Sequence, residues 1–278
     1  MTKKVVALRE GKTMKYYREK LASQGAMLFS LIDPDKLPLE KGAAVARASY
    51  EGGADVILVG GSIGVQGGVL DETVKQIKEN APGLPVVLYP GSPGGLTPEA
   101  DAVYFMQMLN SRDVYWLSTA QIQAAPVVAR MKIEAIPTSY VILEPGRAVG
   151  WIGNANAVPR DRADLAAACA LAARYLGARV FITDSGSGAP SPAPSEMISA
   201  IRKMCAAGNG DEMLYFYAGG VKNAEHATGV IKAGAHGLHV GNAFEEGEGE
   251  ARGAGGAAAI ARVRKIADAV HAEGRKRV

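Results

Sequence analysis

Short apolar segments alternate with helix-like segments along most of the chain. The apolar segments are rich in Val, Ile, Leu and Tyr and have the length of single strands. Strands that alternate with helices indicate βα units and a parallel sheet. We expect eight strands, at residues 26–33, 54–60, 85–90, 102–106, 138–144, 179–184, 213–218 and 237–240.

Helical patterns fill most of the gaps, at residues 38–51, 70–80, 119–131, 162–176, 194–207 and 223–233. The gap between Pro90 and Ala102 is different, because it holds only eleven residues and five of them are Gly or Pro. A crossover between parallel strands normally needs a dozen or more residues and is usually helical. We therefore predict an α/β fold, a modified (βα)8 TIM barrel whose third helix is missing or replaced by a loop. A doubly wound open sheet is the alternative.

The length and composition fit a single barrel domain over residues 1–278. The chain has 278 residues, 48% of them hydrophobic, which is enough for a full core. The barrel core is expected at about 24–244. A C-terminal linker and helix follow at about 245–278, and residues 245–259 have the Gly, Ala and Glu composition of a flexible connection before a helix that reaches about His271.

Charge and cysteine content exclude several classes of protein. The 31 basic and 28 acidic residues give a net charge of +3, too balanced for a nucleic-acid-binding surface. Cys169 and Cys205 lie far apart without metal-ligand spacing, so neither a disulfide framework nor a zinc site is expected. The chain lacks an apolar run of about 18–20 residues and an N-terminal signal pattern, so we expect a cytoplasmic protein.

Glycine-rich loops follow the last three expected strands. Glycine lets backbone N–H groups approach an anion, and TIM barrels commonly bind phosphate with the loops after strands seven and eight. Each Gly-Gly pair alone is equally well explained by a turn, but three adjoining loops favour a phosphate site. These loops contain Asp184, Ser185, Gly186, Ser187 and Gly188, then Gly219, Gly220 and Lys222, then Gly241 and Asn242.

A carboxylate also stands at the end of the first expected strand. Asp33 begins a loop that holds Asp35 and Lys36, and Ser62 ends the neighbouring strand. Carboxylate and hydroxyl oxygens suit Mg²⁺, which usually keeps several waters and binds substrate phosphates as well. The equally simple alternative is that one Asp caps the next helix and the other forms a surface ion pair.

Two other motifs suggest hydrolysis. Residues 60–64 match the G-x-S-x-G nucleophile elbow of α/β hydrolases, and Asp184 with His226, His236 or His239 would complete a triad in the right order. The elbow should pass directly into a helix, whereas Gly67 and Gly68 extend the loop, so this match is weak. Asp33-Pro34-Asp35 resembles the start of a phosphatase motif, but Leu37 stands where Thr or Val is expected.

The same loops, in the same order, resemble those of geranylgeranylglyceryl phosphate synthases and their bacterial relatives. The resemblance covers residues 26–244. It implies a TIM barrel without a third helix, which transfers a polyprenyl group from its diphosphate to a hydroxyl of a phosphorylated three-carbon acceptor. The segments that carry it are LIDPDK, VGGSIGVQ, LYPGSPGGL, MLNSRD, EAIPTSYVILEPGRAVGWIGNANAVPRD, DSGSGAP, YAGGVKN and GLHVGNAF.

The resemblance assigns roles to residues of this chain. Asp33 corresponds to the Mg²⁺ ligand and Ser62 stands at the metal-binding Thr, so Mg²⁺ is the implied cofactor. Asp184 corresponds to the family's glutamate, which is a plausible base. The implied acceptor-phosphate site consists of Ser185, Ser187, Gly188, Gly219, Gly220, Gly241 and Asn242.

A prenyl tail needs a long apolar groove, and aromatic and Met residues are candidates to line it. Each of them alone is equally well explained as core or interface. The relatives form dimers or larger assemblies, so we expect a homodimer, with transient contact between product and a membrane surface. The groove candidates are Tyr104, Phe105, Met106, Met108, Tyr115, Trp116, Tyr140 and Trp151.

The loop after strand six departs from the family pattern Tyr-x-Glu-Ala-Gly-Ser-Gly. Here Ile182 replaces the Tyr and Asp184 replaces the Glu, while Lys222 stands where many relatives have Arg. The change suggests a different acceptor. It favours the moenomycin-pathway branch of the family, which joins a farnesyl chain to the 2-hydroxyl of 3-phosphoglycerate. Glycerol 1-phosphate is the alternative acceptor, and a non-catalytic phosphosugar-binding barrel is the alternative of another class.

Overall fold

Eight parallel strands close into a barrel in a computed structural model that describes residues 10–61, 66–207, 212–245 and 256–278. Each strand pairs with the next along the chain, and β8 pairs with β1, Met27 opposite Gly237. The sequence prediction of eight strands in a TIM barrel is confirmed. The strands are β1 (Met27–Ile32), β2 (Val56–Gly61), β3 (Val86–Pro90), β4 (Ala102–Met108), β5 (Glu134–Ile142), β6 (Val180–Asp184), β7 (Leu214–Ala218) and β8 (Gly237–Val240).

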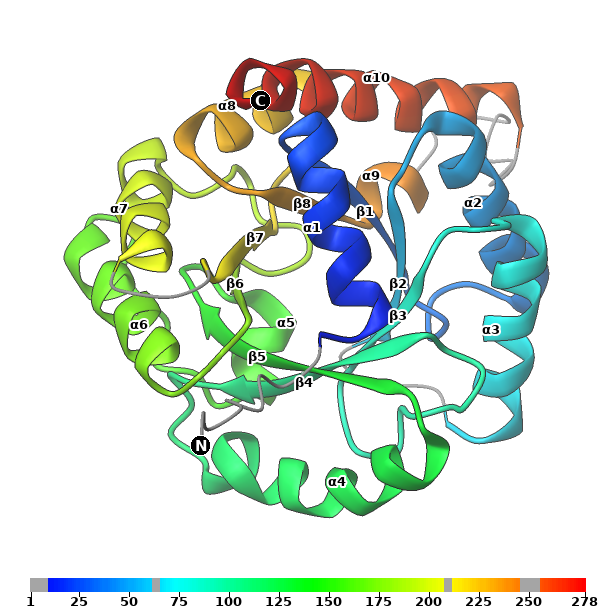
Figure 1. Cartoon of the computed structure of the whole chain (residues 1–278), viewed down its shortest axis with the longest axis horizontal. Helices are drawn as coiled ribbons and strands as arrows, with labels where there is room; N and C mark the ends of the chain where they lie inside the picture. Colours follow the sequence, from blue (N-terminus) through cyan, green and yellow to red (C-terminus); the bar gives the residue numbers. More distant parts are fainter. Residues whose placement is uncertain (1–9, 62–65, 208–211, 246–255) are drawn as a thin grey trace, which may run out of the picture.

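Most crossover helices lie where the hydrophobic period places them, and they form a ring outside the barrel (Figure 1). Residues 91–101, between β3 and β4, form turns and bends instead of a helix. This agrees with the short, Gly- and Pro-rich gap in the sequence. The ring consists of α2 (Leu39–Gly52), α3 (Gly68–Asn80), α4 (Ala120–Met131), α6 (Ala163–Tyr175), α7 (Ser195–Ala206), α8 (Ala224–Ala233) and α10 (Ala257–Gly274).

Several helices were not expected from the sequence. The N-terminal helix α1 (Lys12–Gln24) lies across the amino-terminal end of the barrel (Figure 1). It is strongly polar and buries few side chains, but Tyr17 is fully buried against the rings of Phe29 and Phe216. The short α5 (Arg147–Ile152) follows β5. A π-helix, η1 (Tyr115–Thr119), leads into α4.

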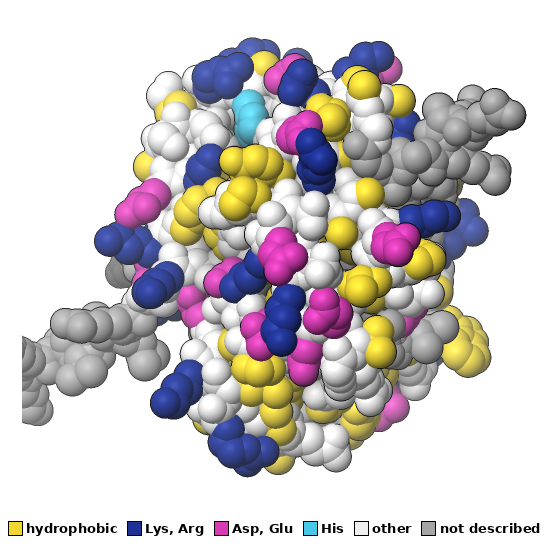
Figure 2. All heavy atoms as spheres, turned by 90° about the vertical axis from the view of Figure 1, so that its right-hand side faces the viewer, with side chains coloured by type: hydrophobic (Ala, Val, Ile, Leu, Met, Phe, Trp, Pro, Cys, Tyr) yellow, Lys and Arg dark blue, Asp and Glu magenta, His cyan; other side chains and the backbone are white. Residues whose placement is uncertain are grey.

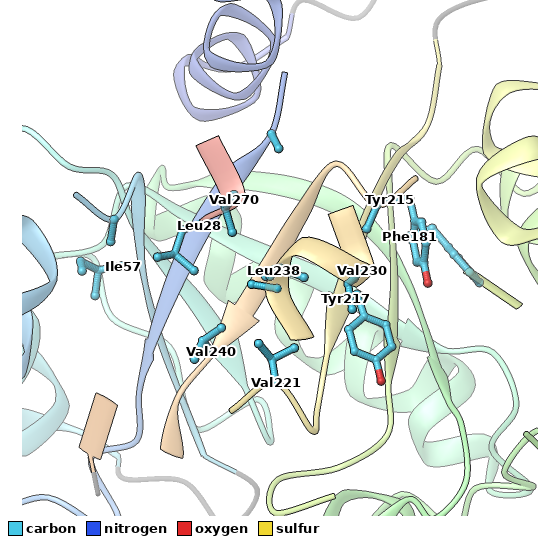
Figure 3. Packing of buried hydrophobic residues seen from close by; sticks show 14 of the residues in the cluster. Leu28, Ile57, Phe181, Tyr215, Tyr217, Val221, Val230, Leu238, Val240 and Val270 are labelled. Atoms are coloured by element: carbon cyan, nitrogen blue, oxygen red, sulfur yellow. The ribbon is translucent and has the colours of Figure 1, made fainter. Parts of the chain in front are cut away.

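Buried side chains form two layers, because successive residues of a strand point to opposite faces. One layer lies between the strands and the outer helices, where Leu28 and Leu238 of the barrel belong to the same cluster as Val230 of α8 and Val270 of α10 (Figure 3). The second layer fills the barrel and includes Phe29. The helices therefore hold the barrel from outside while aromatic rings fill it.

The C-terminal region closes the ring beside β1. The short α9 (Asn242–Glu245) follows β8, and α10 packs against α2, α8 and β1. A last turn, η3 (Arg275–Arg277), ends the chain. Most of the connection expected at 245–259 lies outside the described residues.

The surface over α2 and α3 carries basic and acidic side chains side by side (Figure 2). Among the described helices, none is both long and apolar enough to cross a bilayer. Cys169 and Cys205 are free thiols, and Cys205 is buried.

Candidate active site

A cavity of about 690 Å³ opens at the carboxyl ends of the strands. It is bounded by strand-end residues such as Leu31 of β1, Tyr89 of β3 and Val240 of β8. Reactive groups of TIM barrels lie at this end. The predicted residues that line it are Asp33, Asp184, Ser187, Gly188, Gly219, Gly220, Gly241 and Asn242.

The loops after β6, β7 and β8 meet on one side of this cavity. The Ser187 hydroxyl donates a hydrogen bond of 2.8 Å to Asn242 Oδ1, which joins the first loop to the third. Ser185 is placed differently from the expectation. Its side chain is fully buried 3.0 Å from the Tyr217 hydroxyl and is not among the residues that line the cavity.

Gly220 shows why glycine is needed in the second loop. Its φ of +72° lies in the left-handed region, and a Cβ atom there would lie 2.4 Å from the carbonyl oxygen of Ser191. The loop after β6 therefore packs directly on the backbone of the loop after β7. This close approach leaves a concave, backbone-lined surface of the kind that binds phosphate.

Asp184 ends β6 and is buried. Its Oδ2 accepts a hydrogen bond of 2.6 Å from the Tyr140 hydroxyl, and its Oδ1 accepts one of 2.6 Å from the Gly186 N–H. Burial raises the pKa of Asp184 above its ordinary value, and these two hydrogen bonds oppose that shift. The carboxylate is thus held in place and poised to take a proton.

The hydrolase triad is not assembled in the described part of the chain. His226 Nδ1 lies 3.1 Å from the Gly220 carbonyl oxygen, and His236 Nδ1 accepts from the Tyr215 N–H. Both nitrogens of His239 lack a partner among the described residues. None of the three histidines is bonded to Asp184, and the candidate nucleophile Ser62 lies outside the described residues.

The loop after β1 brings two carboxylates over β2. A Cβ atom on Gly61 would lie 2.6 Å from Asp33 Oδ1 and 2.7 Å from Asp35 Oδ2, so both oxygens converge on the space that this glycine leaves. Lys36 Nζ lies 2.8 Å from Asp33 Oδ2. Helix α2 begins after Pro38 without a side-chain cap, so the helix-cap half of the alternative for these aspartates is wrong, whereas its ion-pair half is found between Asp33 and Lys36.

An apolar groove of about 100 Å³ opens between the loop after β3 and helices η1, α4 and α5. Five residues, including Met106 and Tyr140, line both this groove and the cavity, so the two lie side by side and share a wall. Of the predicted groove residues, Tyr115 does not line it, and Trp151 is 86% exposed outside it. Those that line it are Tyr104, Phe105, Met106, Met108, Trp116 and Tyr140.

Sequence reasoning missed Tyr89 and Arg262 as cavity residues, and it named His239 only as a candidate for a hydrolase triad. Tyr89 and His239 come from buried strands, and Arg262 comes from α10, far from any loop motif. Only the strand alternation hints that Tyr89 and His239 point inward. No three His, Cys, Asp or Glu side chains converge as a metal cluster in the described residues.

The closed parallel barrel, with a glycine-lined cavity and an adjoining apolar groove at the carboxyl ends of its strands, has the architecture of a TIM-barrel enzyme. The family model described as the PcrB family matches residues 19–256, and the chain belongs to this family. It is a prenyltransferase.

Individual relatives agree with this membership. The geranylgeranylglyceryl phosphate synthase of Pyrococcus horikoshii is 44% identical over 239 residues, which cover 86% of this chain and 91% of the relative. The synthase of Methanothrix thermoacetophila is 45% identical over 224 residues, covering 81% and 86%. The structure of (S)-3-O-geranylgeranylglyceryl phosphate synthase from Thermoplasma acidophilum in complex with substrate sn-glycerol-1-phosphate has a TM-score of 0.83 and 28% identity, covering 95% of this chain and 100% of that chain.

Proposed function

We propose that this prenyltransferase joins a polyprenyl chain, geranylgeranyl in the first instance, to a hydroxyl of glycerol 1-phosphate and forms an ether. The observation that carries the proposal is that the glycine-lined cavity and the apolar groove lie side by side and share Met106 and Tyr140 in their walls. A phosphorylated acceptor and a prenyl chain bound in these two spaces would meet beside Asp184. The names of the relatives support the same pair of substrates.

The expectation of 3-phosphoglycerate and an antibiotic pathway is not supported by these relatives, which are all named as geranylgeranylglyceryl phosphate synthases. The geometry at Asp184 also disfavours it. Tyr140 and Gly186 hold this carboxylate at the cavity wall, where its pKa is raised by burial. A second carboxylate placed beside it would repel it strongly, whereas a neutral hydroxyl would hydrogen-bond to it.

The residues near Gly61 fit a magnesium ion. Asp33 and Asp35 present carboxylate oxygens to one space, which suits a hard cation that binds one or two carboxylates and substrate phosphates. Asp33 and Asp35 would hold the ion, and Ser62 remains a further candidate ligand. When bound, the ion supplies positive charge that stabilises a departing diphosphate.

The proposed reaction breaks the allylic carbon–oxygen bond, and its electron pair leaves with the diphosphate. The acceptor hydroxyl oxygen then forms the new bond to the allylic carbon, and its proton passes to Asp184 as general base. Tyr140 holds Asp184 toward the cavity. Lys36 and Lys222 line the same cavity and offset the negative charge of the phosphate groups.

The test offers acceptors in parallel to the purified chain with Mg²⁺ and either geranylgeranyl or farnesyl diphosphate. The acceptors are sn-glycerol 1-phosphate, its enantiomer sn-glycerol 3-phosphate, and 3-phosphoglycerate, with ethers read by mass spectrometry. We expect an ether with sn-glycerol 1-phosphate and a large loss in Asp184→Asn. An ether only with 3-phosphoglycerate would overturn the acceptor assignment, and no ether with any acceptor would overturn the proposed function.

A further inference from the structure

One arginine of the cavity comes from a helix that the family model does not reach. The match ends at residue 256, and α10 begins at Ala257. This helix runs along the outside of the barrel between α2 and α8 (Figure 1). Arg262 lies on its second turn and lines the cavity together with Gly241, Asn242 and Ala243.

The guanidinium of Arg262 is incompletely satisfied. Its Nε atom is buried and has no hydrogen-bond partner among the residues that the structure describes. Arginine stays charged at all physiological pH values, and a buried N–H without an acceptor is unfavourable. Arg262 therefore brings a permanent positive charge to the wall of the cavity, beside Gly241 and Asn242.

We propose that Arg262 binds a phosphate oxygen of the acceptor, which makes α10 part of the active site. This inference rests on the proposed function for the identity of the acceptor. The planar guanidinium can donate two parallel hydrogen bonds to one phosphate group, which a backbone loop alone does not provide. The neighbours of Arg262 in the cavity are Gly241, which follows β8, and Asn242 and Ala243 of α9, in the region where a barrel binds monophosphate.

The diphosphate of the prenyl donor has the same chemistry and is the other source of a phosphate oxygen. Asp33 and Lys36 line the same cavity from the β1 side, where the donor diphosphate is expected to bind. The experiment therefore uses one probe for each source. These are sn-glycerol 1-phosphate for the acceptor and inorganic pyrophosphate with Mg²⁺ for the donor.

Binding is measured by calorimetry on the full chain in Arg262→Gln, Arg262→Lys and a matched control, Arg264→Gln. Arg264 lies on the same helix but is exposed and donates to the Glu51 carbonyl oxygen at 2.8 Å, away from the cavity. We expect Arg262→Gln to raise the Kd for sn-glycerol 1-phosphate at least tenfold and Arg262→Lys to raise it less. Arg264→Gln should leave this Kd within twofold of the wild-type value. Pyrophosphate binding should change less than threefold in all three variants.

Unchanged acceptor binding in Arg262→Gln, with a native circular dichroism spectrum, would overturn the proposal. Weaker pyrophosphate binding, together with unchanged acceptor binding, would overturn the assignment to the acceptor. Inorganic phosphate serves as a further probe that requires no turnover. If no ether forms but Arg262→Gln still weakens the binding of inorganic phosphate tenfold, the proposed function fails while the anion-binding role of Arg262 stands.

Discussion

The Tyr140 hydroxyl donates a 2.6 Å hydrogen bond to Asp184 Oδ2, across the neighbouring strands β5 and β6. The Gly186 N–H donates a hydrogen bond to the other carboxylate oxygen, Asp184 Oδ1. Burial raises the pKa of Asp184, and both bonds favour its charged form and lower that pKa. The two strands thus keep a buried carboxylate available as a base.

Replacing Tyr140 with Phe removes one of these bonds and should raise the pKa of Asp184 further. A hydrogen bond to a charged group contributes about 1.5–3 kcal/mol, which corresponds to about one to two pKa units. Because the base must be ionised, the acidic limb of the kcat/KM profile should move to higher pH by that amount. Steady-state rates from pH 5 to 9 measure this limb.

A second tyrosine provides the control for the loss of a buried hydroxyl. Tyr215 is fully buried and its hydroxyl lies 2.8 Å from Thr183 Oγ1, in the layer outside the barrel. Tyr215→Phe should lower stability without moving the pH profile. An acidic limb that stays in place in Tyr140→Phe would contradict the role of Tyr140 in tuning Asp184.

A separate prediction about acceptor binding concerns Gly220 in the loop after β7. In Gly220→Ala the new Cβ would contact the Ser191 carbonyl, and φ of +72° is unfavourable for alanine. The variant should lose about 1–3 kcal/mol of stability and raise KM for the acceptor at least tenfold. Steady-state kinetics and urea unfolding of the same preparation measure the two effects.

Gly229→Ala is the matched control, because a Cβ there meets nothing within 4 Å and the residue lies inside α8. It should stabilise the protein by about 0.5–1 kcal/mol and leave KM unchanged. If Gly220→Ala binds the acceptor normally, the phosphate group does not contact this loop.

The fold was largely predictable because buried strands and amphipathic helices each have a recognisable pattern of hydrophobic residues in the sequence. Helix α1 was not, because the helix is polar on average and its buried hydrophobic side chains are only Met14 and Tyr17. The loop of residues 91–101 could be predicted from its length and its Gly and Pro content. The carboxyl ends of parallel strands share one end of a barrel, so the strand pattern also predicts that Asp33, Asp184 and the glycines lie together there.

The rest of the site depends on tertiary contacts that no local pattern encodes. Arg262 reaches the cavity only because α10 folds back beside β1 and α9. Ser185 belongs to the right loop, but its hydroxyl points to Tyr217. Tyr115 and Trp116 are adjacent, and helix geometry places only Trp116 in the groove.

We expect the apolar groove to determine which length of prenyl chain the enzyme prefers. Ala124 of α4 lines it, so Ala124→Trp should fill part of the groove. We expect KM for geranylgeranyl diphosphate to rise at least tenfold, with a smaller effect on dimethylallyl diphosphate, whose chain is shorter. Competition between the two donors in one reaction measures the preference directly.

Ala125 is the neighbouring residue, but it is exposed and does not line the groove. Ala125→Trp should therefore leave the donor preference unchanged. An Ala124→Trp enzyme that keeps the wild-type preference would show that the prenyl chain binds elsewhere.

The last prediction concerns His239 and the dependence of the protein's stability on pH. It lies inside the barrel between Tyr104 and Phe29, and burial lowers its pKa to about 3. The unfolded chain binds a proton near pH 6.5. Between pH 6.5 and pH 3 the unfolded state therefore holds more protons at this residue, and the folded state loses stability as the pH falls.

The slope is about 1.4 kcal/mol per pH unit for one proton, so His239 should cost about 2 kcal/mol between pH 6.5 and pH 5. His239→Phe, or His239→Leu if the larger ring does not fit, removes this proton and both unpartnered nitrogens. Such a variant should equal or exceed the wild type in stability at pH 7 and lose less at pH 5. Urea unfolding at both pH values measures the difference, and an identical loss in wild type and variant would show that His239 is not held neutral.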